Sequence, residues 1–167
     1  MTDYIAQAAG ALVKRCGTRD PLMIARRIGV CVLFRDDFVN LKGMYSVIKR
    51  SRFIFINSNL EKPMRRLVCA HELGHDALHR EVASKNAVQD TLLFGIDSRQ
   101  EYEANLFAAH LLIDESEVLS LAKQGFTSQY IAAQLKIDVN MISIIADHLI
   151  TQGHELNPVV RKNNILR

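Results

Sequence analysis

Several features are scarce in this sequence, and each scarcity excludes a class of protein. Only three cysteines occur, none in a CxxC pair, so neither a disulfide framework nor a thiolate metal site is expected. No apolar run approaches the roughly 20 residues of a membrane span. The net charge of +3 is too small to indicate nucleic-acid binding. With 49% apolar and 23% charged residues, the 167-residue chain has the composition of an ordinary globular domain.

The few cysteines and the start of the chain both favour a cytoplasmic protein. Cys16, Cys31 and Cys69 each lie within an apolar pattern, which predicts buried, reduced thiols. Met1-Thr2-Asp3 leads directly into an amphipathic helix pattern, unlike a signal peptide. We therefore expect the protein to work in the cytoplasm, without a membrane.

Hydrophobic periodicity predicts a mixed part followed by a helical part. We expect one domain over residues 1–153, in which residues 126–153 resemble a helix-turn-helix, and a polar tail over 154–167. A polar segment, residues 80–97, interrupts the pattern and is a candidate lid. Helices are expected over about 3–16, 21–29, 64–79, 98–113, 114–125, 126–137 and 138–153, and strands over 30–34, 44–48 and 53–56, the last two as a hairpin.

The most informative segment is His71-Glu72-Leu73-Gly74-His75, an HExxH motif on a predicted helix. Residues four apart share a helix face, so His71 and His75 can direct one nitrogen each at a single zinc ion. Glu72 leans to one side of that ion, where it can act as general base toward a metal-bound water. Both histidines lie on the stripe expected to be buried, where a metal would satisfy them. Gly74 indicates a close approach by the sheet backbone or by a substrate.

A catalytic zinc usually has three protein ligands and one water, so a third ligand must be found. The extended motif HExxHxxGxxH, in which a third histidine is the third ligand, is not present, because Leu78 and Glu81 occupy its glycine and histidine positions. His79 lies about 12 Å along a straight helix from His71, too far to bind the same ion. We expect His79 to support the ligands or to pack.

The predicted helix over 98–113 offers two carboxylates. Glu101 shares a face with small apolar residues that suits packing against the HExxH helix, which makes it the favoured third ligand. Asn105, one turn later, can accept a hydrogen bond from the outer nitrogen of a zinc-bound histidine. Glu103 is offset by about 200° from Glu101 on the helical wheel and remains the alternative ligand.

Together these segments resemble the ImmA/IrrE family of metallopeptidases. The resemblance covers roughly residues 20–115 and rests on three matches: IFIN over 54–57, AHELGH over 70–75 with the Leu-His pair at 78–79, and EYEANLFAAHLL over 101–112. It implies an α+β, zincin-like domain in which a small, mainly antiparallel sheet packs on the HExxH helix, followed by a helical C-terminal part. It also implies a single catalytic zinc on His71, His75 and Glu101, with Glu72 as the base.

The family resemblance also implies a partner, namely a helix-turn-helix repressor of a mobile element or stress response, which the protein would cleave. A different function, a zinc-containing module that binds a repressor or antitoxin without cutting it, would keep the same ligands. A DNA-binding regulator is disfavoured, because residues 139–149 contain no lysine or arginine to contact phosphate or bases. Tyr45, Tyr102 and His110 are candidate oxyanion donors for a peptidase.

Overall fold

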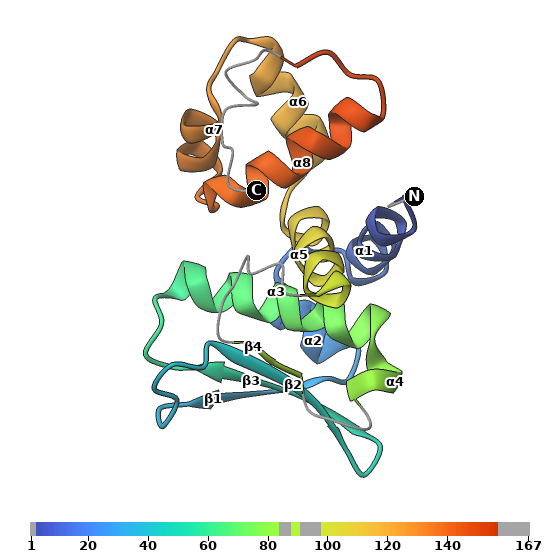
Figure 1. Cartoon of the computed structure of the whole chain (residues 1–167), viewed down its shortest axis with the longest axis vertical. Helices are drawn as coiled ribbons and strands as arrows, with labels where there is room; N and C mark the ends of the chain where they lie inside the picture. The colour runs from blue at the N-terminus through green and yellow to red at the C-terminus, as the bar shows by residue number, and fades with distance from the viewer. Residues whose placement is uncertain (1–2, 84–87, 91–97, 157–167) are drawn as a thin grey trace. The chain divides into compact units, whose positions relative to one another are not determined.

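The computed structural model describes residues 3–83, 88–90 and 98–156, and the chain divides into two compact units, Met1–Leu112 and Ile113–Arg167 (Figure 1). The expected single domain over 1–153 stays a prediction. The first unit contains helices α1 (Asp3–Cys16), α2 (Pro21–Arg27), α3 (Lys62–Leu78), α4 (Arg80–Ala83) and α5 (Arg99–Leu112), and strands β1 (Cys31–Arg35), β2 (Gly43–Ile48), β3 (Ser51–Asn57) and β4 (Val88–Asp90). The second contains α6 (Glu115–Lys123), α7 (Ser128–Leu135) and α8 (Val139–Thr151).

The sheet has the strand order β1-β3-β2-β4. β2 and β3 form the predicted hairpin, whose two turn residues, Lys49 and Arg50, have φ values of 47° and 68°. Such positive angles at both turn residues match the twist of a hairpin closed by two residues. β1 joins β3 in parallel, whereas β4 pairs with β2 in antiparallel fashion. The sheet is therefore mainly antiparallel, as expected, with β4 as a strand that periodicity did not predict.

β1 lies at one edge of the sheet, and most of its side chains are exposed. Cys31, at its start, is exposed, whereas Cys16 and Cys69 are buried. The expectation of three buried thiols is therefore wrong for Cys31. An apolar run does not distinguish an edge strand from a buried one, because neighbouring strands decide the burial.

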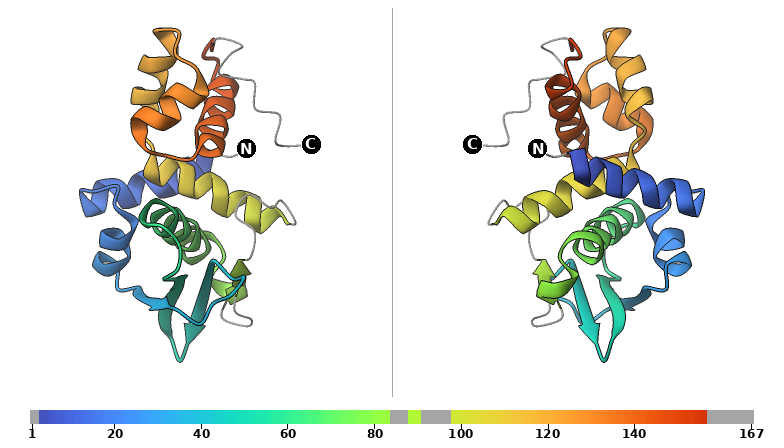
Figure 2. Two further views of the ribbon diagram at one scale, coloured as in Figure 1. Left: turned by 90° about the vertical axis from the view of Figure 1, so that its left-hand side faces the viewer. Right: turned by 90° about the vertical axis from the view of Figure 1, so that its right-hand side faces the viewer.

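Helix α3 is the interior element of the first unit. It packs against β2 and β3 on one side and against α5 on the other, and α1 packs on α5 (Figures 1 and 2). Ten consecutive residues, Leu67 to Asp76, are buried, so this helix is covered all round rather than along one stripe. Polar side chains among these ten residues must find partners inside the protein.

The close packing of α3 and α5 depends on Gly74. A Cβ atom added at this glycine would lie 3.0 Å from the Cα atom and 3.1 Å from the carbonyl oxygen of Ala104. Backbone atoms cannot rotate out of the way, so a larger residue would push the two helices apart. The close neighbour predicted at Gly74 was the sheet or a substrate, and this was wrong, because the neighbour is α5.

Side-chain caps begin most of the predicted helices where the sequence indicated. Asp20, Asp114 and Asp138 each accept a hydrogen bond from a backbone N–H in the first turn of the helix that follows. Thr127 does the same for α7, one residue later than the predicted start. Most of the segment proposed as a lid falls on residues 84–87 and 91–97, and most of the polar tail on 157–167, all outside the described residues.

The second unit places α7 and α8 around a short turn, as in the expected helix-turn-helix pattern. Within α8, Asp147 and Thr151 alone are exposed, and the other side chains are buried or half-buried. A recognition helix usually contacts phosphates and bases with basic side chains, and α8 contains no lysine or arginine. Over the described part of the chain, no helix is both long and apolar enough to cross a membrane.

Two glycines in helices provide a matched test of the α3–α5 contact. We expect Gly74→Ala to lower the free energy of unfolding of the metal-free chain by about 1–3 kcal/mol, the usual cost of overpacking. Gly10→Ala, in α1 with no atom within 4 Å of an added Cβ, should raise it by roughly 0.5–1 kcal/mol through helix propensity alone. Urea unfolding with a chelator present measures both, and equal stabilisation by the two changes would contradict the close packing.

Candidate metal centre

Three side chains from α3 and α5 converge on one point. The Nε2 atoms of His71 and His75 lie 3.1 Å apart. The Glu101 carboxylate oxygens lie 3.2 Å from the first of these nitrogens and 3.5 Å from the second. Two nitrogen ligands in a tetrahedral zinc shell are about 3.3 Å apart, so the cluster has the dimensions of a metal site.

Each of these positions follows from local structure. His71 and His75 lie one turn apart on α3, and Glu101 lies in the first turn of α5. The contact between Gly74 and Ala104 brings the two helices close enough for that carboxylate to reach both imidazoles. Their burial differs: the histidine side chains are at most 1% exposed, whereas the glutamate side chain is 19% exposed. The cluster is therefore almost dry.

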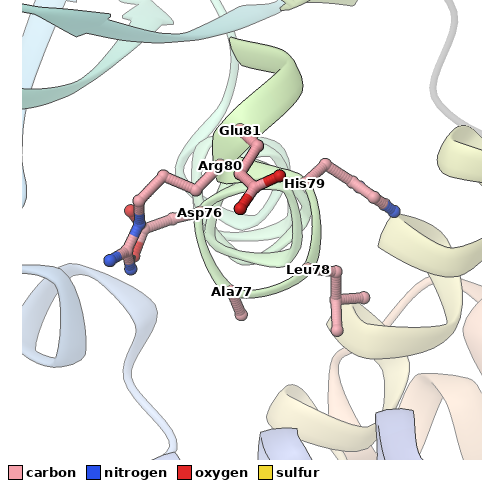
Figure 3. Close-up of a pocket in the computed structure, with 6 residues that line it drawn as sticks. All are labelled: Asp76, Ala77, Leu78, His79, Arg80 and Glu81. Carbon is pink, nitrogen blue, oxygen red and sulfur yellow. The ribbon is translucent and has the colours of Figure 1, made fainter. Parts of the chain in front are cut away.

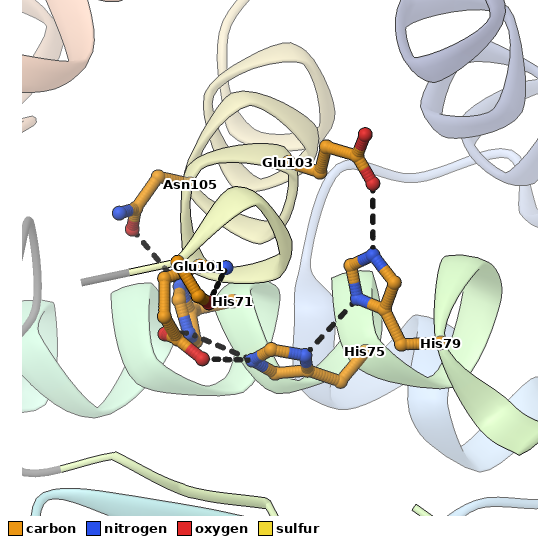
Figure 4. A network of polar contacts seen from close by, with 7 residues as sticks. His71, His75, His79, Glu101, Glu103 and Asn105 are labelled. Atoms are coloured by element: carbon orange, nitrogen blue, oxygen red, sulfur yellow. Dashed lines mark hydrogen bonds and ion pairs between the residues drawn. The ribbon is translucent and has the colours of Figure 1, made fainter. Parts of the chain in front are cut away.

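Asn105 also lies where the sequence indicated. Its Oδ1 atom is 2.9 Å from Nδ1 of His71 (Figure 4). An amide oxygen can only accept, so Nδ1 of His71 carries the proton and donates it, with the amide oriented accordingly. Nε2 of that ring then presents a lone pair to the cluster, which is the form a metal ligand needs.

The electrostatics of the cluster suit a cation. Burial, and then the neighbouring His71, lower the pKa of His75 to about 3 although Glu101 opposes the shift, so His75 is neutral near pH 7. Burial raises the pKa of Glu101, but its close contact with His71 and the electrostatic effect of the nearby imidazoles outweigh burial and bring this pKa below its usual value. A neutral imidazole and a carboxylate together form a donor set that divalent ions such as zinc prefer.

Glu72 lies on a neighbouring row of α3 and faces strand β2. It is fully buried, and an added Cβ at Gly43 would lie 2.5 Å from its Oε1 atom and would also meet Val68. The backbone of β2 therefore runs directly beside this carboxylate, and only glycine leaves it room. Sequence reasoning did not identify Gly43, because the register that brings β2 to α3 is non-local.

His79 and Glu103 lie beside the cluster rather than in it. Nδ1 of His79 is 3.2 Å from Nδ1 of His75, and its Nε2 is 2.9 Å from the Glu103 carboxylate (Figure 4). That carboxylate also accepts a 2.7 Å bond from Arg99. Burial raises the pKa of Glu103, but bonds from His79, Arg99 and Tyr4 outweigh it and lower the pKa to about 2. Glu103, the alternative ligand of the sequence analysis, thus points its charge at His79.

A second polar group lies on the side of α3 away from His79. The buried Asp76 carboxylate accepts bonds of 2.6 Å from the Tyr45 hydroxyl, 2.7 Å from Arg52 and 3.2 Å from Arg80. Figure 3 shows the Arg80 and His79 side chains pointing to opposite sides of the helix end, around a surface hollow lined by residues 76–81. Tyr45 is fully buried and donates its hydroxyl to Asp76, so this candidate oxyanion donor instead ties β2 to α3.

These elements define a class of protein. Two histidines one helical turn apart, an adjacent buried glutamate and a carboxylate from a following helix, beside a small sheet, are the parts of a metallopeptidase site.

Comparison with known proteins specifies the family. The profile of peptidase family M78, described as the IrrE N-terminal-like domain, matches residues 25–144. The chain is 36% identical over 128 residues to "Uncharacterized immunity region protein 2" of Bacillus phage phi105, covering 77% of this chain and 80% of the relative. It is 32% identical over 147 residues to "Metallopeptidase ImmA" of Bacillus subtilis strain 168, covering 85% and 81%. The chain therefore belongs to the ImmA/IrrE family of metallopeptidases, and the zincin-like α+β fold expected from its sequence is confirmed.

Removing Glu101 tests the predicted ligand set. We expect the chain loaded with zinc to keep one equivalent after gel filtration, and Glu101→Ala to lose it, because only two imidazoles then remain. Glu117→Ala, an exposed carboxylate on α6, is the control that should keep the metal. Elemental analysis of the eluted protein measures this, and full zinc retention by Glu101→Ala would exclude Glu101 as a ligand.

Proposed function

We propose that the chain is a zinc-dependent endopeptidase that cleaves a helix-turn-helix transcriptional repressor at a specific site. The observation that supports this most directly is the convergence of His71, His75 and Glu101, with Glu72 buried beside them. The names of the two relatives, one an immunity region protein of a phage and one a metallopeptidase, support a role in controlling a mobile element. Because a repressor acts on DNA, this substrate also implies a cytoplasmic enzyme.

In this proposal His71, His75 and Glu101 hold the zinc, and Asn105 orients the first of them. When bound, zinc supplies an acidified water and an electrophile for the scissile carbonyl. Glu72 takes the proton from the attacking water and delivers it to the amine nitrogen as the peptide bond breaks. The close approach of β2 at Gly43 restricts the rotamers of Glu72 and so keeps its carboxylate ready for this transfer.

Glu72→Gln tests the chemistry separately from metal binding. Glutamine has the same size but accepts no proton, so we expect a full equivalent of zinc and a loss of cleavage of at least about 10²-fold. The assay incubates the zinc-loaded chain with the repressor encoded beside it and analyses the mixture by mass spectrometry for fragments. Cleavage by the glutamine variant at the wild-type rate would overturn the mechanism.

The same assay separates the peptidase from a zinc-containing binding module. A peptidase yields two repressor fragments whose masses sum to the intact protein plus one water. Intact repressor in a stable complex with the wild-type chain would instead establish the non-catalytic module. A gel shift with random and operator DNA tests the third function, direct DNA binding, which is disfavoured because α8 contains no lysine or arginine.

Gly43→Ala tests whether the approach of β2 positions the base. The added methyl group would meet both the Glu72 carboxylate and Val68, so we expect cleavage to fall while zinc is retained, since no proposed ligand is touched. Gly10→Ala, in open space on α1, is the matched control and should leave the rate unchanged. A Gly43→Ala enzyme with normal activity and normal zinc content would show that the contact has no role in catalysis.

A further inference from the structure

The outer nitrogen of His75 faces an unusual partner. In metal sites this nitrogen generally bonds a carboxylate, a backbone carbonyl or water. Here it faces a second imidazole, that of His79, and the far nitrogen of His79 faces the Glu103 carboxylate. The three side chains form a continuous line of hydrogen bonds, which Figure 4 shows running from α3 to α5.

The direction of the protons along this line follows from its two ends. The Glu103 carboxylate, which also accepts a bond from Arg99, is the acceptor at one end, so Nε2 of His79 carries a proton and donates it. A neutral His79 then has an accepting Nδ1, which requires Nδ1 of His75 to donate. The remaining nitrogen of His75, Nε2, is left with a lone pair directed at the cluster with His71 and Glu101.

The fold places His79 and Glu103, the two members of the line that lie outside the cluster, as follows. α3 ends at Leu78, and His79 follows as the capping residue, 7% exposed, with its N–H donating to the carbonyl of His75. Glu103 comes two residues after Glu101 on α5, so the two carboxylates lie on different sides of that helix. Helix α5 thus supplies two carboxylates, Glu101 to the cluster and Glu103 to the line of hydrogen bonds behind it.

Glu103 is in turn held by two further side chains. Arg99, one turn earlier on α5, donates to its Oε1 atom at 2.7 Å. Tyr4 of α1 also bonds it, and this bond together with partial burial raises the pKa of the tyrosine. These bonds favour the position in which the Glu103 carboxylate accepts from His79.

We propose that Glu103, acting through His79, is a positioning residue for the metal site: it holds His75 in the tautomer and orientation that bind zinc. This inference rests on the zinc site proposed above. A carboxylate at the end of an imidazole chain also draws proton density away from His75, which makes its Nε2 a stronger donor to the metal. Glu103 therefore affects metal affinity without touching the ion.

A purely structural role for Glu103 would have different consequences. A bond that only tied α3 to α5 would stabilise the folded chain but leave the zinc affinity of the folded protein unchanged. If Glu103 acts on His75 only through His79, then in a variant that lacks His79 a further change at residue 103 should leave the zinc affinity unchanged. The zinc affinity of Glu103 variants, with and without His79, therefore distinguishes the two roles.

The test measures zinc dissociation constants by competition with a chromophoric chelator, and the stability of each metal-free variant by urea unfolding. We expect Glu103→Ala to bind zinc about 10–100-fold more weakly, the usual effect of removing such a partner. Glu103→Gln should recover most of the loss, because its amide oxygen can still accept from His79. His79→Phe should show the larger loss alone, and adding Glu103→Ala to it should cause no further loss. The cobalt-loaded Glu103→Ala chain should also show a shifted visible spectrum, since His75 is reoriented.

Asn105→Ala provides the matched comparison, because it acts on His71 instead of His75. In the double variant with Glu103→Ala, the two fold-losses in zinc affinity should multiply. In the double variant that changes residues 79 and 103, they should not. Unchanged zinc affinity in folded Glu103→Ala, or losses at residues 79 and 103 that multiply, would overturn the inference. If Glu101→Ala loses zinc while Glu103→Ala binds it normally, only the positioning role fails. If the wild-type chain binds no zinc, the proposed function fails as well.

Discussion

The contact between Gly74 and Ala104 is the constraint on which the rest of the site depends. Helices usually pack with their axes 8–10 Å apart, depending on the side chains between them, and a glycine against an alanine allows a close approach. At this approach Glu101 reaches both imidazoles and Asn105 reaches the back of one of them. A wider spacing would leave the histidines on α3 and the carboxylate on α5 too far apart to share an ion.

The burial of α3 explains why its polar side chains have partners on other elements. A helix covered on all sides cannot leave side chains in water, so each row needs its own partners. The row of His71, His75 and His79 faces α5, which supplies two carboxylates and an amide. The row of Glu72 and Asp76 faces the hairpin, where Tyr45 and Arg52 bond the aspartate and Gly43 makes room for the glutamate. Helix α3 thereby places its two proposed ligands against α5 and the proposed base against the sheet.

Local patterns in the sequence were sufficient for some of these features and not for others. Helical spacing predicted that His71 and His75 share a face, and that Glu101 and Asn105 share another, because these relations span one turn of one helix. Gly43, the Asp76 group and the link from His79 to Glu103 were missed, because each depends on a contact between residues 24 to 31 positions apart or on strand register. The exposure of Cys31 and the strand β4 were missed for the same reason: neighbours in the sheet decide them.

The hydrogen bonds around the cluster determine which nitrogen of each histidine carries a proton. In their neutral forms, His71 donates from Nδ1 to Asn105 and His75 donates from Nδ1 to His79, so both rings turn an Nε2 lone pair toward the same point. The Glu101 carboxylate adds a negative charge there. The two Nε2 atoms and the carboxylate repel one another in a nearly dry interior, and a bound cation would attract all three. Folding, in which α3 packs on α5 and α5 on α1, therefore arranges the proposed ligands before any metal binds.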